Sequence, residues 1–445
     1  MIRASVSGLL SLLILAAVSP ATAGDVSADE VSIATYQAAI KVNSLDEAIA
    51  AALANEPQLL AKDSMVGLAE ARLKSAKADG RSQIGINGTY GISHAKIGVD
   101  GMIPFKDFSD IYPRSLAIAW ERRLYDGGAS LAKVSEADFN LAAENGEYKN
   151  ARNQLVVDVV SAYSDVAVAY QGLQFAKDNL TAVERFAHDA GLMFKAGEIP
   201  VSEKAGADAR LAQAQAQYAG AEAQASMANA NLLRLTNRAI ENPVFVNKAP
   251  QLPASEQHAR EFALENHPLL AAGRARVEAA KAMVKAANAN YLPQVSAQVR
   301  GATIRDQFLP GYKQDEVGAY LNFSMPLYTS GKISSGVSQA RYGLEAATRA
   351  NQATERAINM GISQSYAGFY GAMAQVKAAN AALDARLVAM KSVEAEMRVG
   401  ERPMADVLDA QKNLTEAKME VAKANAALLV AKYRIVAAMG GDIIN

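Results

Sequence analysis

Two aspartates near the end of the sequence are the strongest candidates for binding chemistry. Asp406 and Asp409 are three positions apart, so a helix would place both carboxylates on one face, shortly after Gly400 and Pro403. Neighbouring carboxylates attract cations, and rings of carboxylates set the selectivity of narrow pores. The alternative is a solvated helix N-terminus, where the helix dipole favours aspartate. The residues alone leave both interpretations open.

The other chemically active side chains form no catalytic constellation. The 445-residue chain has no cysteine, which excludes disulfides, Cys-based zinc sites and thiol nucleophiles. Gly331-Lys332 lacks the first glycine and the Ser or Thr of a phosphate-binding loop. No metal-ligand spacing connects the four histidines, which are His94, His188, His258 and His267. We therefore expect no enzyme, no metal, no cofactor and, at a net charge of −1, no nucleic-acid partner.

The N-terminus has the pattern of a secretory signal. Arg3 supplies the positive charge, residues 8–18 form the apolar stretch, and Ala21-Thr22-Ala23 matches an A-x-A cleavage site. We expect residues 1–23 to be the signal peptide and 24–43 an N-terminal periplasmic segment. A membrane anchor is the alternative, although about 11 apolar residues are too few to span a bilayer. No later apolar run reaches that length, so an inserted mature protein would need β-strands.

The rest of the sequence consists of two similar halves. At an offset of 211 positions, Leu53, Asn55 and Pro57 recur as Leu264, Asn266 and Pro268. At an offset of 203 positions, Tyr125, Gly128, Gly197 and Pro200 recur as Tyr328, Gly331, Gly400 and Pro403. Such matches at a fixed offset predict an internal duplication. The expected divisions are a first repeat at 44–240, a linker or equatorial segment at 241–254, a second repeat at 255–440 and a short tail at 441–445.

Long tracts without proline predict two unusually long helices, at 128–195 and 331–397. A helix of about 65–70 residues would be ~100 Å long. Shorter helices are predicted at 44–78, 201–240, 255–290 and 404–439. Stacked end to end in pairs, the short helices would match the long ones and form a uniform wall. A soluble coiled-coil rod would satisfy the helices equally well.

Four segments of about ten residues alternate between apolar and polar side chains. They lie at about 82–93, 115–125, 294–304 and 316–327, with polar hairpin loops at 94–114 and 303–315. This length crosses a bilayer when the strand is tilted, and the alternation is typical of a barrel wall. About eight strands are needed to close a barrel, so we expect three copies of the chain to supply twelve. A soluble antiparallel sheet is the alternative.

The combined elements resemble the TolC family of outer-membrane efflux and secretion channels over essentially the whole mature chain. The residues that carry the resemblance are Asn55-Glu56-Pro57, Asn266-His267-Pro268, Leu124-Tyr125-Asp126-Gly127-Gly128, Leu327-Tyr328-Thr329-Ser330-Gly331, Val399-Gly400 and Asp406-Val407-Leu408-Asp409-Ala410-Gln411. Two features depart from the family pattern. Arg123 replaces the usual proline before the first Leu-Tyr pair, although Pro326 is retained. Only five residues follow Gly440, so the family's belt around the tunnel is expected to be thin.

The resemblance implies a mainly α-helical fold with a membrane β-barrel. A homotrimer would form an α-barrel tunnel of long coiled-coil helices in the periplasm, continuous with a twelve-stranded barrel in the outer membrane. Each internally duplicated chain would contribute four strands. By the same resemblance, the helices would close the tunnel at its periplasmic tip and untwist when inner-membrane partners dock.

The resemblance also assigns roles at this tip. Asp406 and Asp409 would form two stacked acidic rings at the periplasmic gate. Glu203 is the counterpart of Asp406, whereas Gly206 stands in place of Asp409, so the acidic pair occurs in one repeat only.

Further residues at the tip would keep the gate closed. Arg402, Ser202 and Glu203 match positions whose polar links hold such a gate shut. The tip turns would contain Gly197, Pro200, Gly400 and Pro403.

We thus expect a passive exit duct of a tripartite export system, most directly type I protein secretion. Its partners would be a periplasmic adaptor (membrane fusion protein), an inner-membrane ABC or RND pump and outer-membrane lipid. Without cysteine the chain has no lipidation site, which favours secretion over the often-lipidated efflux channels. The alternatives are a multidrug or metal efflux channel and, from another class, a soluble periplasmic coiled-coil adaptor or scaffold.

Overall fold

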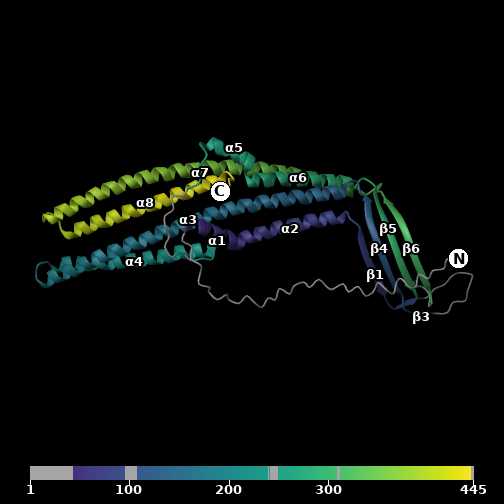
Figure 1. Cartoon of the computed structure of the whole chain (residues 1–445), viewed down its shortest axis with the longest axis horizontal. Coiled ribbons are helices and arrows are strands. Elements are labelled where there is room, and N and C mark those ends of the chain that lie inside the picture. The colour runs from purple at the N-terminus through teal and green to yellow at the C-terminus, as the bar shows by residue number, and fades with distance from the viewer. Residues whose placement is uncertain (1–43, 96–107, 239, 241–248, 308–310, 442–445) are drawn as a thin grey trace, which may run out of the picture. The chain divides into compact units, whose positions relative to one another are not determined.

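The computed structural model describes residues 44–95, 108–238, 240, 249–307 and 311–441. In chain order its elements are α1 (Leu45–Asn55), α2 (Pro57–Asp79), β1 (Gln83–Tyr90), β2 (Ser93–Ala95), β3 (Phe108–Ile111), β4 (Arg114–Tyr125), α3 (Ala129–Lys195), α4 (Val201–Thr236), α5 (Glu256–Asn266), α6 (Pro268–Ala289), β5 (Gln294–Arg305), β6 (Lys313–Ser324), α7 (Lys332–Arg398) and α8 (Met404–Ala438) (Figure 1). The predicted signal peptide, the segment 24–43, most of the linker 241–254 and residues 442–445 of the tail lie outside the described residues.

Two predicted helices are each divided in two, because a proline interrupts them. The segment 44–78 forms α1 and α2, and the segment 255–290 forms α5 and α6. Glu56 and His267 separate these helices with extended backbone (ψ 115° and 124°), and Pro57 and Pro268 begin the next helix. A residue before proline is disfavoured in the α conformation, and proline lacks the N–H that would continue the helix. The expectation of single helices there was wrong.

The two long helices agree with the prediction in length and position. Helices α3 and α7 contain 67 residues each, or ~100 Å of helix. Helix α3 packs against α1, α2 and α4 of its own half and against α6 and α8 of the other half, while α7 packs against α5, α6 and α8. Short helices therefore lie end to end beside each long one, as expected. None of the described helices combines the length and hydropathy needed to cross a membrane.

The largest buried cluster lies around the middle of α3. Val159, Val160 and Val166 of α3 are fully buried there, together with Ala48 of α1 and Leu232 of α4. At this position α1 packs alongside α3 and contacts both α2 and α4. Burial of these apolar side chains holds the stacked short helices to the long one.

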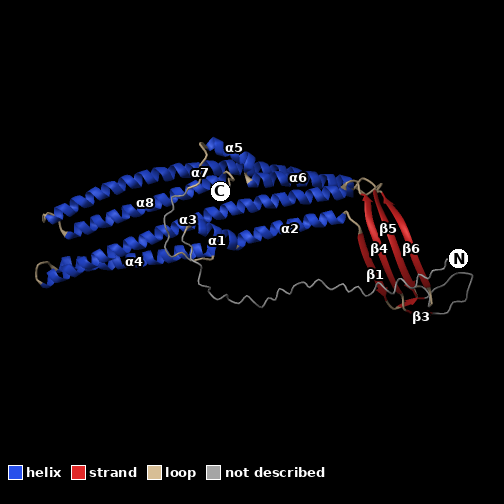
Figure 2. Ribbon diagram, viewed as in Figure 1, coloured by secondary structure: helices blue, strands red, loops and turns tan. Residues whose placement is uncertain are grey.

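The main sheet continues the order of the helices. Its strands lie in the order β1-β4-β5-β6, and all neighbouring pairs are antiparallel. Strands β1 and β5 follow α2 and α6, while β4 and β6 precede α3 and α7. Each strand is therefore connected to one helix, and the sheet lies at one end of the helices (Figure 2).

The predicted hairpin loops are shorter than expected. Strand β2, which begins at Ser93, pairs with β3 at the two ends of the segment 94–114, β5 extends to Arg305 and β6 begins at Lys313. The apolar alternation that located the strands fades at these ends, but backbone pairing does not require apolar side chains.

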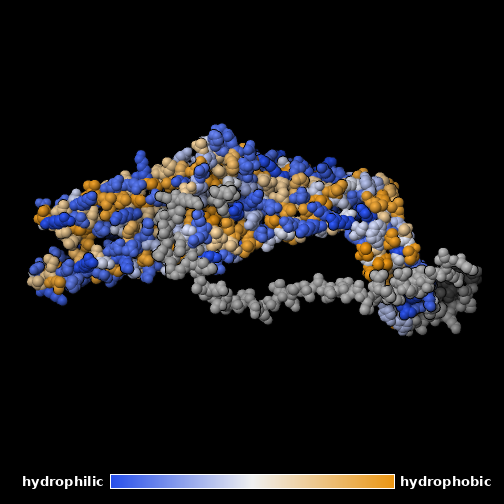
Figure 3. Space-filling model, viewed as in Figure 1, coloured by the Kyte–Doolittle hydropathy of each residue, from blue (hydrophilic) through white to orange (hydrophobic). Residues whose placement is uncertain are grey.

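The two faces of the main sheet differ in polarity. One register row places Ile84, Trp120, Val299 and Ala319 side by side, and the next apolar row contains Ile86, Ile118, Gly301 and Val317. The row between them, on the opposite face, contains Gly85, Ala119, Arg300 and Gly318, followed by Gln83, Glu121, Gln298 and Tyr320. Ile84, Ile86 and Val317 are largely exposed in the single chain. Hydrophobic residues accordingly gather on the visible part of the sheet next to the helices (Figure 3).

Candidate gate at the helix turns

The two long helices turn back through equivalent tight turns, at the end of the helices away from the sheet (Figure 1). Gly197 and Gly400 adopt φ of 79° and 81°, a left-handed conformation that favours glycine. The N–H groups of Glu198 and Glu401 donate to carbonyls of the preceding helix at 2.9 Å. Pro200 and Pro403 then precede α4 and α8 as their N-cap residues. The four residues predicted for the tip turns all lie in these two turns.

Arg402 connects the end of α7 to the start of α8. Its Nε donates to Glu396 Oε2 at 2.5 Å and its Nη1 donates to Asp406 Oδ2 at 3.3 Å. Both carboxylates raise the pKa of the Arg402 guanidinium above its usual value, and Glu396 makes the larger contribution. Asp406 of the predicted acidic pair thus forms an ion pair with Arg402, an arginine of the same turn.

Asp409 has a partner from the other half of the chain. Arg210 of α4 donates from Nη2 to Asp409 Oδ2 at 3.1 Å, and both side chains are partly exposed. The two acids share one face of α8, as predicted, and each is paired with a different arginine.

The acidic pair lines a shallow pocket of about 270 Å³ between α7 and α8. Arg386 and Arg402 line the same pocket with Asp406 and Asp409, so within one chain its formal charges balance. Such a site can exchange partners: a carboxylate that loses its arginine becomes free to attract a cation. No cluster of three or more His, Cys, Asp or Glu suited to a metal ion occurs among the described residues.

Ser202 and Glu203 do not meet Arg402 within this chain. Both are exposed in the first turn of α4, and among the described residues neither side chain hydrogen-bonds to Arg402. Their predicted role in closing the gate stays a prediction.

Sequence reasoning missed Arg210 and Glu396. A single arginine among alternating charges on α4 resembles a solvated face. The duplication held a signal, because each of these charged residues has an uncharged counterpart in the other half at the offset of 203. Arg210 corresponds to Asn413, and Asp409 corresponds to Gly206.

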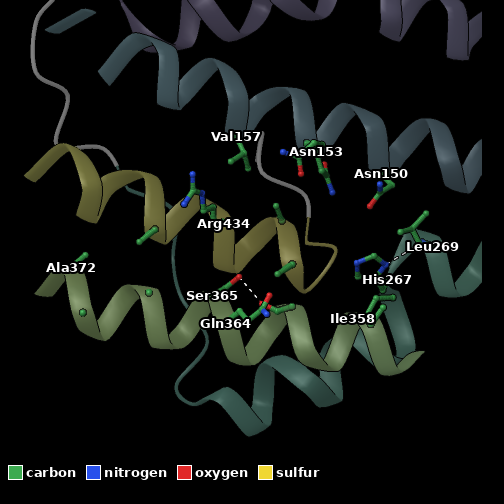
Figure 4. A pocket seen from close by; sticks show the side chains of 18 of the residues that line it. Asn150, Asn153, Val157, His267, Leu269, Ile358, Gln364, Ser365, Ala372 and Arg434 are labelled. Atoms are coloured by element: carbon green, nitrogen blue, oxygen red, sulfur yellow. Dashed lines mark hydrogen bonds between the residues drawn. The ribbon is translucent and has the colours of Figure 1, made fainter. Parts of the chain in front are cut away.

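A second, larger cavity lies halfway along the helices, at the start of α6. It measures about 990 Å³ and is lined by α3, α7 and α8 together with His267 (Figure 4). His267 Nδ1 accepts a hydrogen bond from the Leu269 N–H at 3.1 Å and so caps α6. Burial lowers the pKa of His267 to about 4, which keeps the ring neutral at physiological pH. His267 is therefore a structural cap of α6.

Comparison with known proteins places these features in a family. The family described as "Outer membrane efflux protein" matches residues 48–238 and 260–441. "Outer membrane efflux protein BepC" of Brucella suis biovar 1 (strain 1330) is 26% identical over 412 residues, covering 92% of this chain and 88% of BepC. "Alkaline protease secretion protein AprF" of Pseudomonas aeruginosa is 23% identical over 298 residues, covering 65% of this chain and 62% of AprF.

Solved structures agree on the fold. The CmeC outer membrane channel of Campylobacter jejuni superposes with a TM-score of 0.75 at 18% identity, covering 89% of this chain and 85% of CmeC. The twofold match to one family spans most of the chain, including both turns and all four strands of the main sheet. The chain therefore belongs to the outer membrane efflux protein family, whose members are non-enzymatic channels of tripartite export systems, placed in the outer membrane with their helices in the periplasm.

Proposed function

We propose that three copies of this chain close one barrel and one helical tunnel. Among the described residues, β1 and β6 are the outer strands of the main sheet, each with one edge free of a strand partner. Since neighbouring strands alternate in direction, β6 of one copy runs antiparallel to β1 of the next. Two copies would supply eight strands, and side chains fill the interior of a barrel of that size. Three copies supply twelve, which leave a lumen.

The polarity of the sheet supports the same assembly. The face with Ile84, Trp120 and Val299 is suited to lipid, and the face with Glu121 and Gln298 is suited to a water-filled lumen. The proposed divisions of the chain remain 44–240 and 255–440 for the two repeats, close to the two segments matched by the family.

The duct serves type I protein secretion in this proposal. The proposal that the protein is a duct rests on the free edges of the main sheet. The likeness to AprF, a protease secretion protein, supports secretion. The names of BepC and CmeC favour efflux as the second candidate. In both cases the channel provides the exit, and an inner-membrane pump, reached through a periplasmic adaptor, supplies the energy.

A deletion strain distinguishes the two candidates. Secretion predicts that the strain no longer releases a large protein substrate of its type I exporters while its resistance to drugs and metals is unchanged. Increased drug or metal sensitivity with normal protein release would instead identify an efflux channel. The protein itself should be extracted as a heat-modifiable trimer that requires detergent; release by osmotic shock would contradict the assembly.

We also propose that Asp406 and Asp409 control cation entry at the periplasmic gate, with Arg402, Ser202 and Glu203 forming links between neighbouring copies. The exposed first turn of α4 leaves Ser202 and Glu203 free to reach an adjacent chain. The double substitution Asp406→Ala with Asp409→Ala is expected to abolish block by cations added to the periplasmic side. Planar-bilayer recordings measure this block, and an unchanged block would refute the assignment.

A further inference from the structure

Three cations form a row at the end of the main sheet away from the helices (Figure 2). Arg114 of β4 pairs with Arg305 of β5, and Arg305 pairs with Lys313 of β6. Tyr90 of β1 pairs with Arg114, so the register row crosses all four strands. Residues directly opposite each other in antiparallel strands project from the same face. Arg114, Arg305 and Lys313 therefore form a cationic row on strands that lie about 4.8 Å apart.

The cationic row lies on the apolar face of the main sheet. Side chains along a strand alternate between the two faces, so residues an even number of positions apart share a face. Arg114 is four positions before Ile118, and Lys313 is four positions before Val317, both in an apolar row of this face. The cations therefore lie at the border of the face suited to lipid, not on the face suited to the lumen.

The length of the apolar face fits a bilayer between two charged borders. Arg122, eight positions after Arg114, is the next cation on this face of β4. Eight residues of antiparallel strand measure ~27 Å, which is ~20 Å across a membrane at a tilt near 45°. The apolar band of an outer-membrane barrel is about 25 Å tall. In the proposed barrel, whose helices lie in the periplasm, the cationic row is therefore at the outer leaflet.

The cationic row is unfavourable for the sheet taken alone. Like charges directly opposite each other destabilise a strand pair, and here two such pairs are adjacent. Two aspartates compensate in part: Arg114 Nη2 lies 3.3 Å from Asp306 Oδ2, and Arg305 Nη2 lies 2.8 Å from Asp315 Oδ1. Lys313 is exposed and forms no ion pair with any described residue. The row thus retains one uncompensated positive charge per chain.

The backbone holds the central arginine in place. Arg305 Nη1 donates to the Ile304 carbonyl at 2.9 Å and to the Gln314 carbonyl at 3.1 Å. A positioned guanidinium beside an unpaired ammonium is suited to phosphate, whose oxygens form strong hydrogen bonds with charged donors. The row therefore has the chemistry of an anion site at a membrane surface.

We propose that the cationic row binds the phosphate groups of the anionic glycolipid in the outer leaflet. Lys313 supplies the uncompensated charge, and attraction to the phosphates offsets the repulsion within the row. Tyr90, which is 77% exposed, adds an aromatic side chain of the kind found where barrels meet the membrane surface. Three copies repeat the row around the barrel. This site rests on the proposed barrel and specifies the lipid that its outer border contacts.

A loss of lipid affinity distinguishes this site from a purely structural row. A Lys or Arg near an anionic membrane surface changes affinity by about fivefold. Lys313→Ala should therefore weaken lipid binding about fivefold, and Lys313→Glu, which changes the charge by two, about 25-fold. Lys313→Arg should bind as the wild type does. Because Lys313 has no ion pair with the described residues, Lys313→Ala should not lower the thermal unfolding midpoint.

Arg300 provides a matched control on the same sheet. It lies on β5, five positions before Arg305, and is exposed on the opposite face. Arg300→Ala removes the same charge from the face suited to the lumen. It should leave lipid affinity at the wild-type value.

The experiment titrates full-length trimers in detergent micelles with lipid A, the phosphorylated anchor of the outer-leaflet glycolipid. Native mass spectrometry of the trimers counts bound lipid and gives the half-saturating lipid concentration. Dephosphorylated lipid A and phosphatidylglycerol, which has one phosphate, are the comparison lipids. Wild type should bind lipid A more tightly than either, and Lys313→Ala should not change binding of the dephosphorylated form.

Each outcome supports or overturns the site. If Lys313→Ala binds lipid A like wild type, or Arg300→Ala weakens binding equally, the site is refuted. Equally tight binding of dephosphorylated lipid A would refute recognition of phosphate, and equally tight binding of phosphatidylglycerol would refute the choice of lipid. A lower unfolding midpoint in Lys313→Ala would assign the row a structural role instead. A wild-type protein that forms no trimer would refute the proposed assembly, whereas the other results, seen in intact trimers, refute the site alone.

Discussion

The two junctions between strand and long helix have the same backbone and different stabilising contacts. Gly128 and Gly331 precede α3 and α7 with φ of 85° and 84°. In the first junction Asp126 accepts hydrogen bonds from the Gly128 N–H at 3.1 Å and from the Ser130 N–H at 2.8 Å. Thr329 stands at the equivalent position of the second junction. Left-handed glycine therefore specifies the path of the chain, while the supporting contacts have diverged.

Arg123 belongs to this divergence. It lies 3.7 Å from Asp126 Oδ2, and its equivalent in the second half is Pro326. The first junction is held by a polar cap with an arginine beside it, whereas the second has a proline ring that restricts the backbone directly. The departure from the family pattern noted at Arg123 thus coincides with a different way of stabilising the same turn.

The largest expected effect comes from transferring a side chain between the junctions. Ser330 adopts φ of 48°, and its equivalent is Gly127 with φ of 67°. A Cβ at position 127 would lie 2.7 Å from Leu292 Cβ and 3.0 Å from the Ala289 carbonyl oxygen. Gly127→Ser should therefore destabilise the protein by about 2–4 kcal/mol, as left-handed strain adds to overpacking.

Denaturant unfolding in detergent measures this effect. Gly128→Ser is the matched control, because a Cβ there meets no atom within 4 Å and only the backbone strain remains. Ser330→Gly should change stability by less than about 1 kcal/mol. A Gly127→Ser variant no less stable than Gly128→Ser would show that Leu292 can move aside.

A smaller effect is expected where the short helices meet. His267 and Glu56 occupy equivalent positions, both are buried, and Glu56 Oε2 has no hydrogen-bond partner among the described residues. Because burial lowers the pKa of His267 to about 4, the unfolded chain, with a pKa near 6.5, binds the proton first on acidification. The stability held by neutral His267 is present above pH 6.5 and is lost towards pH 4, with about 2 kcal/mol lost by pH 5.

His267→Asn should remove this pH dependence, since asparagine caps helices and does not titrate in this range. Unfolding midpoints at pH 7 and pH 5 measure the difference. His258→Asn, at an exposed position on α5, should retain the wild-type slope. Equal slopes for wild type and His267→Asn would contradict the burial of a neutral imidazole.

The smallest effect distinguishes the two junction caps. Burial raises the pKa of the Asp126 carboxyl, but hydrogen bonds from Ser130 and Gly128 outweigh it, so the pKa lies below its usual value. Asp126→Ala should cost about 1 kcal/mol at neutral pH, and this contribution should disappear as the pH falls below about 4. Thr329→Ala should change stability by less than about 0.5 kcal/mol, as at an ordinary surface position. Parallel thermal unfolding tests both, and similar losses would show that the junctions are stabilised alike.

The sequence predicted the features that depend on local backbone preferences. Gly197, Gly400 and the prolines that follow them indicated both turns. Glycine permits positive φ and proline restricts φ, and both effects are independent of the rest of the chain. The same principle would have predicted the breaks at Glu56 and His267, had Pro57 and Pro268 been treated as the starts of new helices.

Contacts between distant residues were not predictable in this way. Arg210 and Asp409 are 199 positions apart, and the duplication shows only that each is charged in one half of the chain, without indicating that the two side chains meet. The acidic pair itself was located by spacing and family resemblance. Its arginine partners depend on how α4 and α8 are placed, which only the packing of the long helices determines.

The unpaired edges of β1 and β6 have a consequence for biogenesis. Within the described part of a lone chain, β1 and β6 each present a row of unpaired backbone groups beside an apolar face, and such edges pair readily with any available strand. In the proposed trimer, completion of the sheet is coupled to association, so the folded fraction depends on the concentration of newly exported chains. On this proposal the period of greatest aggregation risk falls between export and closure of the barrel, and a periplasmic chaperone would need to shield strand edges as well as apolar side chains.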